Sequence, residues 1–192
     1  MTVNVSTGKF NALSSFRYWL ETNVPPTSVT PNWTYTFLQQ LTNTSFPIVQ
    51  VTEYMSPDPG SDSLGMIVAP YAVYPSSAPA TEGSPQRMGV KISIQDDITV
   101  DVNALQTIYQ IRDQIRHALI LAGQANDATG AVAIPNVEIM DYAQSPALDT
   151  GFSVEIEDEA GSIIERYIPP DETTPNLHTV ELLVRLGWME MN

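Results

Sequence analysis

Residues 88–123 carry the clearest structural signals of this 192-residue chain and read MGVKISIQDDITVDVNALQTIYQIRDQIRHALILAG. Their first part alternates apolar residues with small or polar ones, and this two-residue period predicts a half-buried β-strand. From residue 104 to residue 122 apolar residues recur every three or four positions, which predicts a helix with one apolar stripe that begins at Leu105. Asp101 or Asn103 can cap this helix, and Gly123 can end it.

A second amphipathic helix is predicted near the N-terminus, over residues 7–23. Its apolar positions have the spacing of one helical face: Phe10, Leu13, Phe16 and Leu20. Pro25 ends this helix, because proline cannot continue one.

Alternating or β-branched runs predict the remaining strands, over residues 46–55, 66–74, 137–142, 152–156, 162–168 and 178–188. Polar segments rich in Pro, Ser, Thr and Gly predict long loop insertions at about 56–86 and 169–177. Helices set against a mostly antiparallel sheet form an α+β architecture. We therefore predict a single α+β domain over residues 1–192, with the helices packed on one face of the sheet.

Composition excludes several functional classes. Eight Lys and Arg residues stand against 22 Asp and Glu residues, and the net charge of −14 argues against a groove that binds nucleic acid phosphates. No apolar run approaches the ~20 residues of a membrane span, and no signal-peptide pattern is present, so no membrane partner is expected. The absence of cysteine excludes disulfides, zinc–thiolate sites and a cysteine nucleophile.

Few residues point to chemistry at a site. Asp58 and Asp62, like Asp96 and Asp97, could offer oxygen ligands to Ca²⁺, but the spacing of a calcium-binding loop is missing. The two histidines belong to no nucleophile-elbow, phosphate-loop, zinc-protease or dinucleotide motif. We therefore predict no catalytic residue, no metal site, no cofactor and no enzymatic activity.

Acidic residues gather in the C-terminal third. Between Glu138 and Glu190 there are twelve carboxylates and two cations, Arg166 and Arg185. These carboxylates form either an ordinary solvated surface or a concentrated negative field, which would repel nucleic acid. The candidates for such an acidic surface are Glu155, Glu157, Asp158, Glu159, Asp171 and Glu172.

Half of the eight cations lie in the central strand–helix unit: Arg87, Lys91, Arg112 and Arg116. Either they only keep the helix soluble, or the unit is a basic patch that meets the acidic third of another copy. Complementary patches on one chain are what a head-to-tail ring requires. These four cations are therefore our candidates for a subunit interface.

The order of the elements also points to a known family. The features that carry the resemblance are the N-terminal helix with Trp19-Leu20 near its end, the strand 90–94, the helix 104–122 with its Ile-Arg-Asp-Gln-Ile-Arg core and the final strand 178–188. In this order they resemble the tail terminator (tail completion) proteins of long-tailed bacteriophages. The resemblance extends over about residues 6–190 and is interrupted by the two loop insertions.

This resemblance implies a non-enzymatic α+β protein of the virion neck or tail that is made in the host cytoplasm. Members of the family form hexameric rings that cap the tail tube, end its polymerisation and join tail to head. The implied partners are other copies, the tail tube protein and head–tail connector or neck proteins, and DNA would pass through the lumen without specific binding. The interface cations would then lie near subunit contacts, and some acidic residues would line the lumen.

Two other interpretations stay open. The chain could be a different neck, connector or baseplate component, or a small acidic module that binds a metal or ligand through residues such as Asp58 or Asp96. An acidic hydrolase that uses a histidine is a further alternative.

Overall fold

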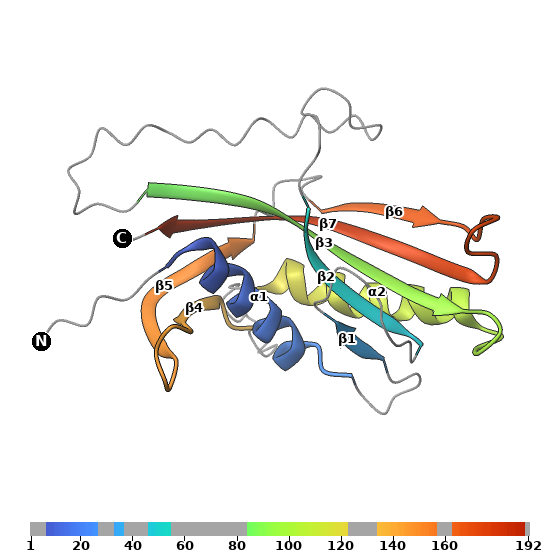
Figure 1. Ribbon diagram of the computed structural model, residues 1–192, viewed down its shortest axis with the longest axis horizontal. Coiled ribbons are helices and arrows are strands. Elements are labelled where there is room, and N and C mark those ends of the chain that lie inside the picture. Colours follow the sequence, from blue (N-terminus) through green and yellow to red (C-terminus); the bar gives the residue numbers. More distant parts are fainter. Residues whose placement is uncertain are drawn as a thin grey trace, which may run out of the picture.

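The computed structural model describes residues 7–26, 33–36, 46–54, 84–122, 134–156 and 163–190 (Figure 1). The helices of this part are α1 (Lys9–Asn23) and α2 (Ala104–Leu121). Its strands are β1 (Thr34–Thr36), β2 (Ile48–Tyr54), β3 (Ser84–Asp97), β4 (Val137–Asp141), β5 (Leu148–Ile156), β6 (Ile164–Ile168) and β7 (Leu177–Glu190).

All seven strands belong to one sheet, in the order β1-β2-β3-β7-β5-β4, with β6 also paired to β7. The centre is the antiparallel pair of β3 and β7, whose 14 residues each pair along their whole length, from Ser84↔Glu190 to Asp97↔Leu177. The other edge of β7 is shared, because β6 pairs with its first half and β5 with its second. Only β1 and β2 run parallel among the described pairs.

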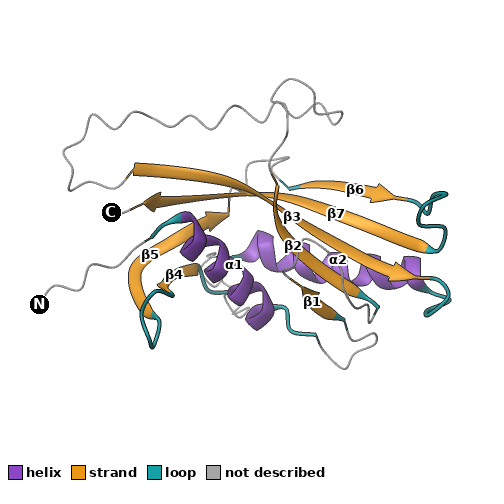
Figure 2. Ribbon diagram, viewed as in Figure 1, coloured by secondary structure: helices purple, strands orange, loops and turns teal. Residues whose placement is uncertain are grey.

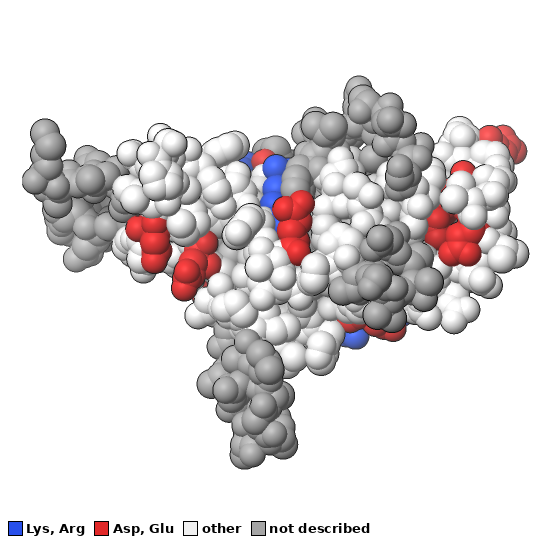
Figure 3. All heavy atoms as spheres, turned by 90° about the horizontal axis from the view of Figure 1, so that it is seen from below, with Lys and Arg blue, Asp and Glu red and all other residues white. Residues whose placement is uncertain are grey.

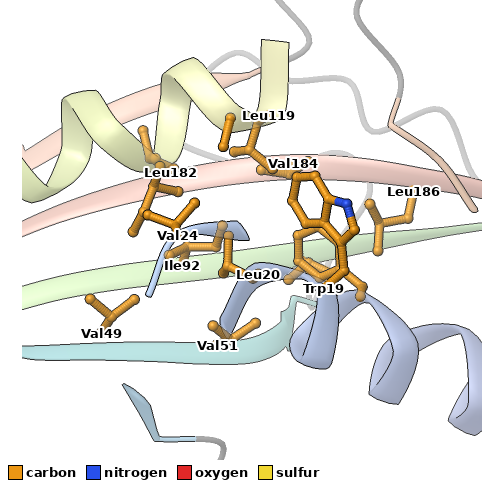
Figure 4. Close-up of a cluster of buried hydrophobic side chains, with 14 of the residues drawn as sticks. Trp19, Leu20, Val24, Val49, Val51, Ile92, Leu119, Leu182, Val184 and Leu186 are labelled. Carbon is orange, nitrogen blue, oxygen red and sulfur yellow. The ribbon is translucent and has the colours of Figure 1, made fainter. Parts of the chain in front are cut away.

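Both helices cover the same side of this sheet (Figure 2), which we call the inner face. Their apolar side chains pack with those of β2, β3 and β7 in one core (Figure 4). Leu20 of α1, Ile92 of β3, Leu119 of α2 and Leu182 of β7 are all almost completely buried there. The predicted α+β fold, with a mostly antiparallel sheet and helices on one face, is therefore confirmed.

The central strand–helix unit folds as its sequence period predicts. Apolar residues at every second position of β3 face the core, and α2 ends one residue before the predicted helix end. Asn103 is the N-cap residue but makes no side-chain capping bond. Asp101 instead accepts hydrogen bonds from the Asn103 backbone N–H (2.8 Å) and the Thr107 hydroxyl (2.6 Å). Gly123 lies outside the described residues.

The prediction for α1 is right in extent to within two residues, and Phe16 and Leu20 of the predicted face are buried, but Phe10 is not. Phe10 is 73% exposed, whereas Asn11 and Ser15 are buried together with Phe16 and Leu20. The buried polar side chains lie against β4, whose outer edge no other described strand covers.

Hydrogen bonds explain this orientation of α1. The Ser15 hydroxyl accepts the Met140 backbone N–H at 2.9 Å, and the Asn11 side-chain oxygen accepts that of Tyr142 at 3.2 Å. An unpaired strand edge leaves backbone groups without partners, and their burial is costly. The helix therefore turns its polar side chains to the sheet edge.

Several element boundaries also differ from the predictions. β3 begins at Ser84, inside the predicted loop 56–86, and β5 begins at Leu148 rather than near residue 152. Gly151 allows the irregular β4–β5 pairing, because it adopts a φ of 74° that other residues rarely adopt. The predicted loop 169–177 is confirmed up to β7, whereas the predicted strand 66–74 lies outside the described residues.

Candidate interaction surfaces

The functional candidates among the described residues are surfaces rather than a metal site or a membrane-spanning helix. Within them, no three His, Asp or Glu side chains come close enough to hold a metal ion. Neither α1 nor α2 is long and apolar enough to cross a lipid bilayer. Asp58 and Asp62 lie outside the described residues.

The four cations proposed for a subunit interface do not share one surface. Arg87 and Lys91 alternate along β3 with the buried Met88 and Val90, so they belong to the outer face of the sheet, opposite the helices. Arg112 and Arg116 are on α2, which covers the inner face. The expected basic patch is therefore divided between two sides of the sheet.

Arg112 makes its contacts within its own chain. Its guanidinium forms ion pairs with Asp113 (2.9 Å) and with Glu165 of β6, and it lies 4.8 Å from the centre of the Tyr109 ring. Tyr109 in turn lies against Tyr167 of β6. Through these contacts β6 packs against α2. Arg116, one turn further along, is exposed.

Two further cations join Arg87 and Lys91 on the outer face. Arg166 of β6 is paired with Glu181 of β7, so their side chains lie on the same face of the sheet. Arg185 is four residues after Glu181 in β7, and because side chains alternate along a strand it lies on that face as well. Lys91 forms an ion pair with Glu181 at 3.3 Å, which places both on this side of the sheet.

We call these four residues the cationic sheet face: Arg87, Lys91, Arg166 and Arg185. It holds half of the cations of a chain whose net charge is −14. Sequence reasoning missed this grouping because Arg166 and Arg185 were counted only as neighbours of acidic residues. The alternation along β7 was the signal that could have revealed it.

The acidic candidates are also dispersed. Glu155 is exposed on β5 opposite Gly187, near the end of β7, whereas Asp171 and Glu172 are exposed in the loop before β7 begins. The ten residue steps from Leu177 to Gly187 span about 33 Å of strand. Figure 3, which views the helix side, shows acidic side chains in separate groups near the middle and towards both ends. Glu157, Asp158 and Glu159 lie outside the described residues.

One end of the sheet is nevertheless strongly acidic. The β3–α2 connection and the β6–β7 loop meet there, where the Ile98 backbone N–H donates to the Asn176 carbonyl at 3.0 Å. We call this region the acidic end, and its carboxylates are Asp96, Asp97, Asp101, Asp171 and Glu172. Residues 92–111 and 167–178 contain no Lys or Arg.

Most carboxylates of the acidic end organise the two loops. Asp97 accepts hydrogen bonds from the backbone N–H and the hydroxyl of Thr99, at 2.7 and 2.6 Å, which lower the pKa of Asp97. Asp171 likewise accepts hydrogen bonds from Thr173 and Thr174, which lower the pKa of Asp171 to about 2. Both loops are therefore held in defined conformations by charged acceptors.

Asp96 differs from the other carboxylates because it is fully buried. One of its oxygens accepts the Asp97 backbone N–H at 2.9 Å, whereas Oδ2 has no hydrogen-bond donor within the described part of the chain. Burial, and to a lesser extent the neighbouring Asp101, raise the pKa of Asp96 to about 6. In its protonated form Asp96 can donate to the carboxylate of Asp101.

The acidic end also exposes apolar side chains. Four of them lie within eight consecutive residues, and their exposed fractions are 45% for Ile98, 67% for Val100, 82% for Val102 and 42% for Leu105. We call these four residues the apolar turn. Sequence reasoning missed it, although residues 98–102 fit neither the strand period before them nor the helix period after them.

Comparisons with known proteins assign no family. No family model matches this chain, and no curated protein matches its sequence. The surface features of the described residues that bear on function are the cationic sheet face, the acidic end and the apolar turn.

Proposed function

We propose that this protein is a structural component that assembles into a ring, as phage tail terminator proteins do. In this proposal the ring, with six copies, caps the tail tube, ends its polymerisation and joins the tail to the head. The protein acts by assembly and without catalysis or a cofactor. Its place is the virion neck, its site of synthesis the host cytoplasm, and its partners are further copies, the tube protein and connector proteins.

The observation that carries the proposal is the separation of opposite charges on one acidic chain. Copies with a net charge of −14 repel one another unless a cationic surface of one meets an acidic surface of the next. The cationic sheet face and the acidic end are such a pair, and they are different surfaces of the chain. A contact between two different surfaces is head-to-tail, and it closes into a ring when the rotation between copies permits.

The remaining charge is compatible with a channel for DNA. Neutralised contacts between copies would leave most carboxylates unpaired, and an acidic lumen repels the phosphates that pass through it. The architecture, with helices on one face of a mostly antiparallel sheet, also supports the proposal, because the resemblance to tail terminator proteins implies this fold.

The test is the mass and shape of the purified protein. Six copies of a 21.1 kDa chain give a particle of about 127 kDa in light scattering behind size exclusion. Negative-stain images of that peak should show annular particles of uniform diameter. A chain that stays monomeric up to several hundred micromolar would contradict assembly by this protein alone.

A further inference from the structure

We infer that the apolar turn between β3 and α2 is the docking element by which one copy binds the cationic sheet face of the next. This inference rests on the proposed ring and identifies the two surfaces that hold neighbouring copies together.

Exposure is the first argument. Single exposed apolar residues are common on protein surfaces. Here four branched aliphatic side chains are exposed within eight residues, and Val100 and Val102 are each at least two-thirds exposed. Exposed apolar side chains concentrated in one short segment are typical of a contact with another molecule.

Local order is the second argument. The Val100 and Asp101 backbone N–H groups both donate to the Asp97 carbonyl at 2.9 Å, and the Ala104 N–H donates to the Asp101 carbonyl. The Asp97 and Asp101 side chains complete the turn through Thr99, Asn103 and Thr107. A turn that is ordered before it binds loses little conformational entropy on docking, which favours its use as a contact.

Charge identifies the occupant. The apolar turn includes or adjoins Asp97 and Asp101, and the β6–β7 loop that carries Asp171 and Glu172 meets it at Ile98. Residues 92–111 and 167–178 contain no Lys or Arg. An apolar centre with an acidic rim requires a partner with a cationic rim. The cationic sheet face provides Arg87 and Arg166, both exposed, and the half-buried Arg185. With Lys91 these cations outnumber Glu155 and Glu181, which lie on the same face of the sheet. A second copy of this chain therefore meets the requirement.

The experiment compares two variants with the same change in charge. Val100→Asp with Val102→Asp introduces two carboxylates at the apolar turn, whereas Phe10→Asp with Tyr18→Asp introduces two on α1, where both aromatic side chains are exposed. Circular dichroism and thermal melting establish that each variant folds. We expect the turn variant to require at least a tenfold higher concentration to assemble, and the α1 variant to assemble like wild type.

A mixing experiment tests which surface the turn meets. Arg166→Glu with Arg185→Glu reverses charges of the cationic sheet face and should also prevent assembly. In a mixture with the turn variant, each heterodimer contains one intact turn and one intact face. We therefore expect 1:1 dimers near 42 kDa that grow no further, which a contact between identical surfaces would not give.

The outcomes separate this inference from the proposed ring. A turn variant that forms rings as readily as wild type overturns the inference and leaves the ring intact. Equal loss in the turn and α1 variants shows that added negative charge alone prevents assembly, and also overturns it. A mixture without dimers overturns the pairing of turn and face. A wild-type chain that never assembles overturns both proposals.

Discussion

At the scale of single residues, Asp96 shows how the environment sets the state of a carboxyl group. It ends the inner-face row of β3, stands opposite His178 in the β3–β7 register and neighbours Asp101 and Asp97. An aspartate between a strand and a helix is commonly a solvent-exposed residue of the turn, whereas Asp96 is buried. Burial disfavours the ionised form, so its pKa is raised to about 6.

The first prediction concerns pH. Because the folded-state pKa of Asp96 exceeds its unfolded value of about 3.8, the folded chain binds its proton more tightly. Protonation of Asp96 therefore contributes to the free energy of unfolding, and this contribution is complete below pH 3.8 and is lost as pH rises through 6. It amounts to at most about 3 kcal/mol, at about 1.4 kcal/mol per pKa unit. Asp96→Asn should remove this dependence, since its amide can donate to Asp101 at every pH. Urea unfolding between pH 4.5 and 7.5 measures it.

Asp171→Asn is the matched control for this prediction. The pKa of Asp171 is lowered to about 2, so its stabilisation is present above its unfolded pKa and is lost only as pH falls towards 2. It should not alter the slope between pH 4.5 and 7.5. An Asp96→Asn variant with the wild-type slope would contradict the assignment.

At the scale of elements, side-chain contacts decide how α1 and β6 are attached to the sheet. α1 is joined to β4 by Ser15 and Asn11, and the Trp19 indole N–H donates to the Pro135 carbonyl at 2.7 Å. β6 is joined to α2 by Arg112, Tyr109 and Tyr167. The sequence periods predict both elements but not these attachments.

The second prediction tests the attachment of α1. Ser15→Ala should lower the free energy of unfolding by about 1–2 kcal/mol, because it leaves the part-buried Met140 N–H without its acceptor. Ser14→Ala, on the half-buried side of the same helix, should change it by less than about 0.5 kcal/mol. Denaturant unfolding measures the free energy of unfolding of both variants. Equal losses in the two variants would show that the Ser15 hydrogen bond makes no specific contribution to stability.

The third prediction separates the two arginines of α2. Arg112→Ala should destabilise the fold by about 1 kcal/mol and increase amide hydrogen exchange in β6, because it removes the partly buried ion pair with Glu165 and a cation–π contact. Arg116→Ala should leave both stability and exchange close to wild type. Faster exchange of β6 in both variants, or in neither, would contradict a role of Arg112 in holding β6.

At the scale of the whole molecule, net charge governs stability as well as association. With 22 carboxylates and eight cations, most acidic residues have no cation to pair with, even if every Lys and Arg forms an ion pair. The compact fold brings these charges closer together than the unfolded chain does.

The fourth prediction follows from this repulsion. Raising NaCl from 20 to 300 mM shortens the Debye length from about 20 to about 6 Å and should raise the melting temperature by several degrees. Calorimetry at low protein concentration, where assembly is absent, measures the effect on single chains. A melting temperature that falls with salt would mean that attractive ion pairs outweigh the repulsion.

The local pattern of the sequence determined what depends on neighbours along the chain. The alternation of β3 and β7, the extent of both helices and the α+β class were all readable, because a period of two or about 3.6 residues places side chains on one face wherever the element forms. The net charge, and hence the need for compensated contacts, was readable as well.

Only the tertiary structure decided what depends on residues distant in sequence. Asn11 and Ser15 are buried because β4, more than 120 residues away, offers them backbone donors. Arg87 and Arg112 lie on opposite sides of the sheet, although they belong to one strand–helix unit. The reason is that α2 packs against the inner face of the sheet (Figure 2). Arg166 and Arg185 join Arg87 because strand pairing brings β3, β7 and β6 side by side. Periodicity specifies a face of each element, but strand pairing and packing specify which faces meet.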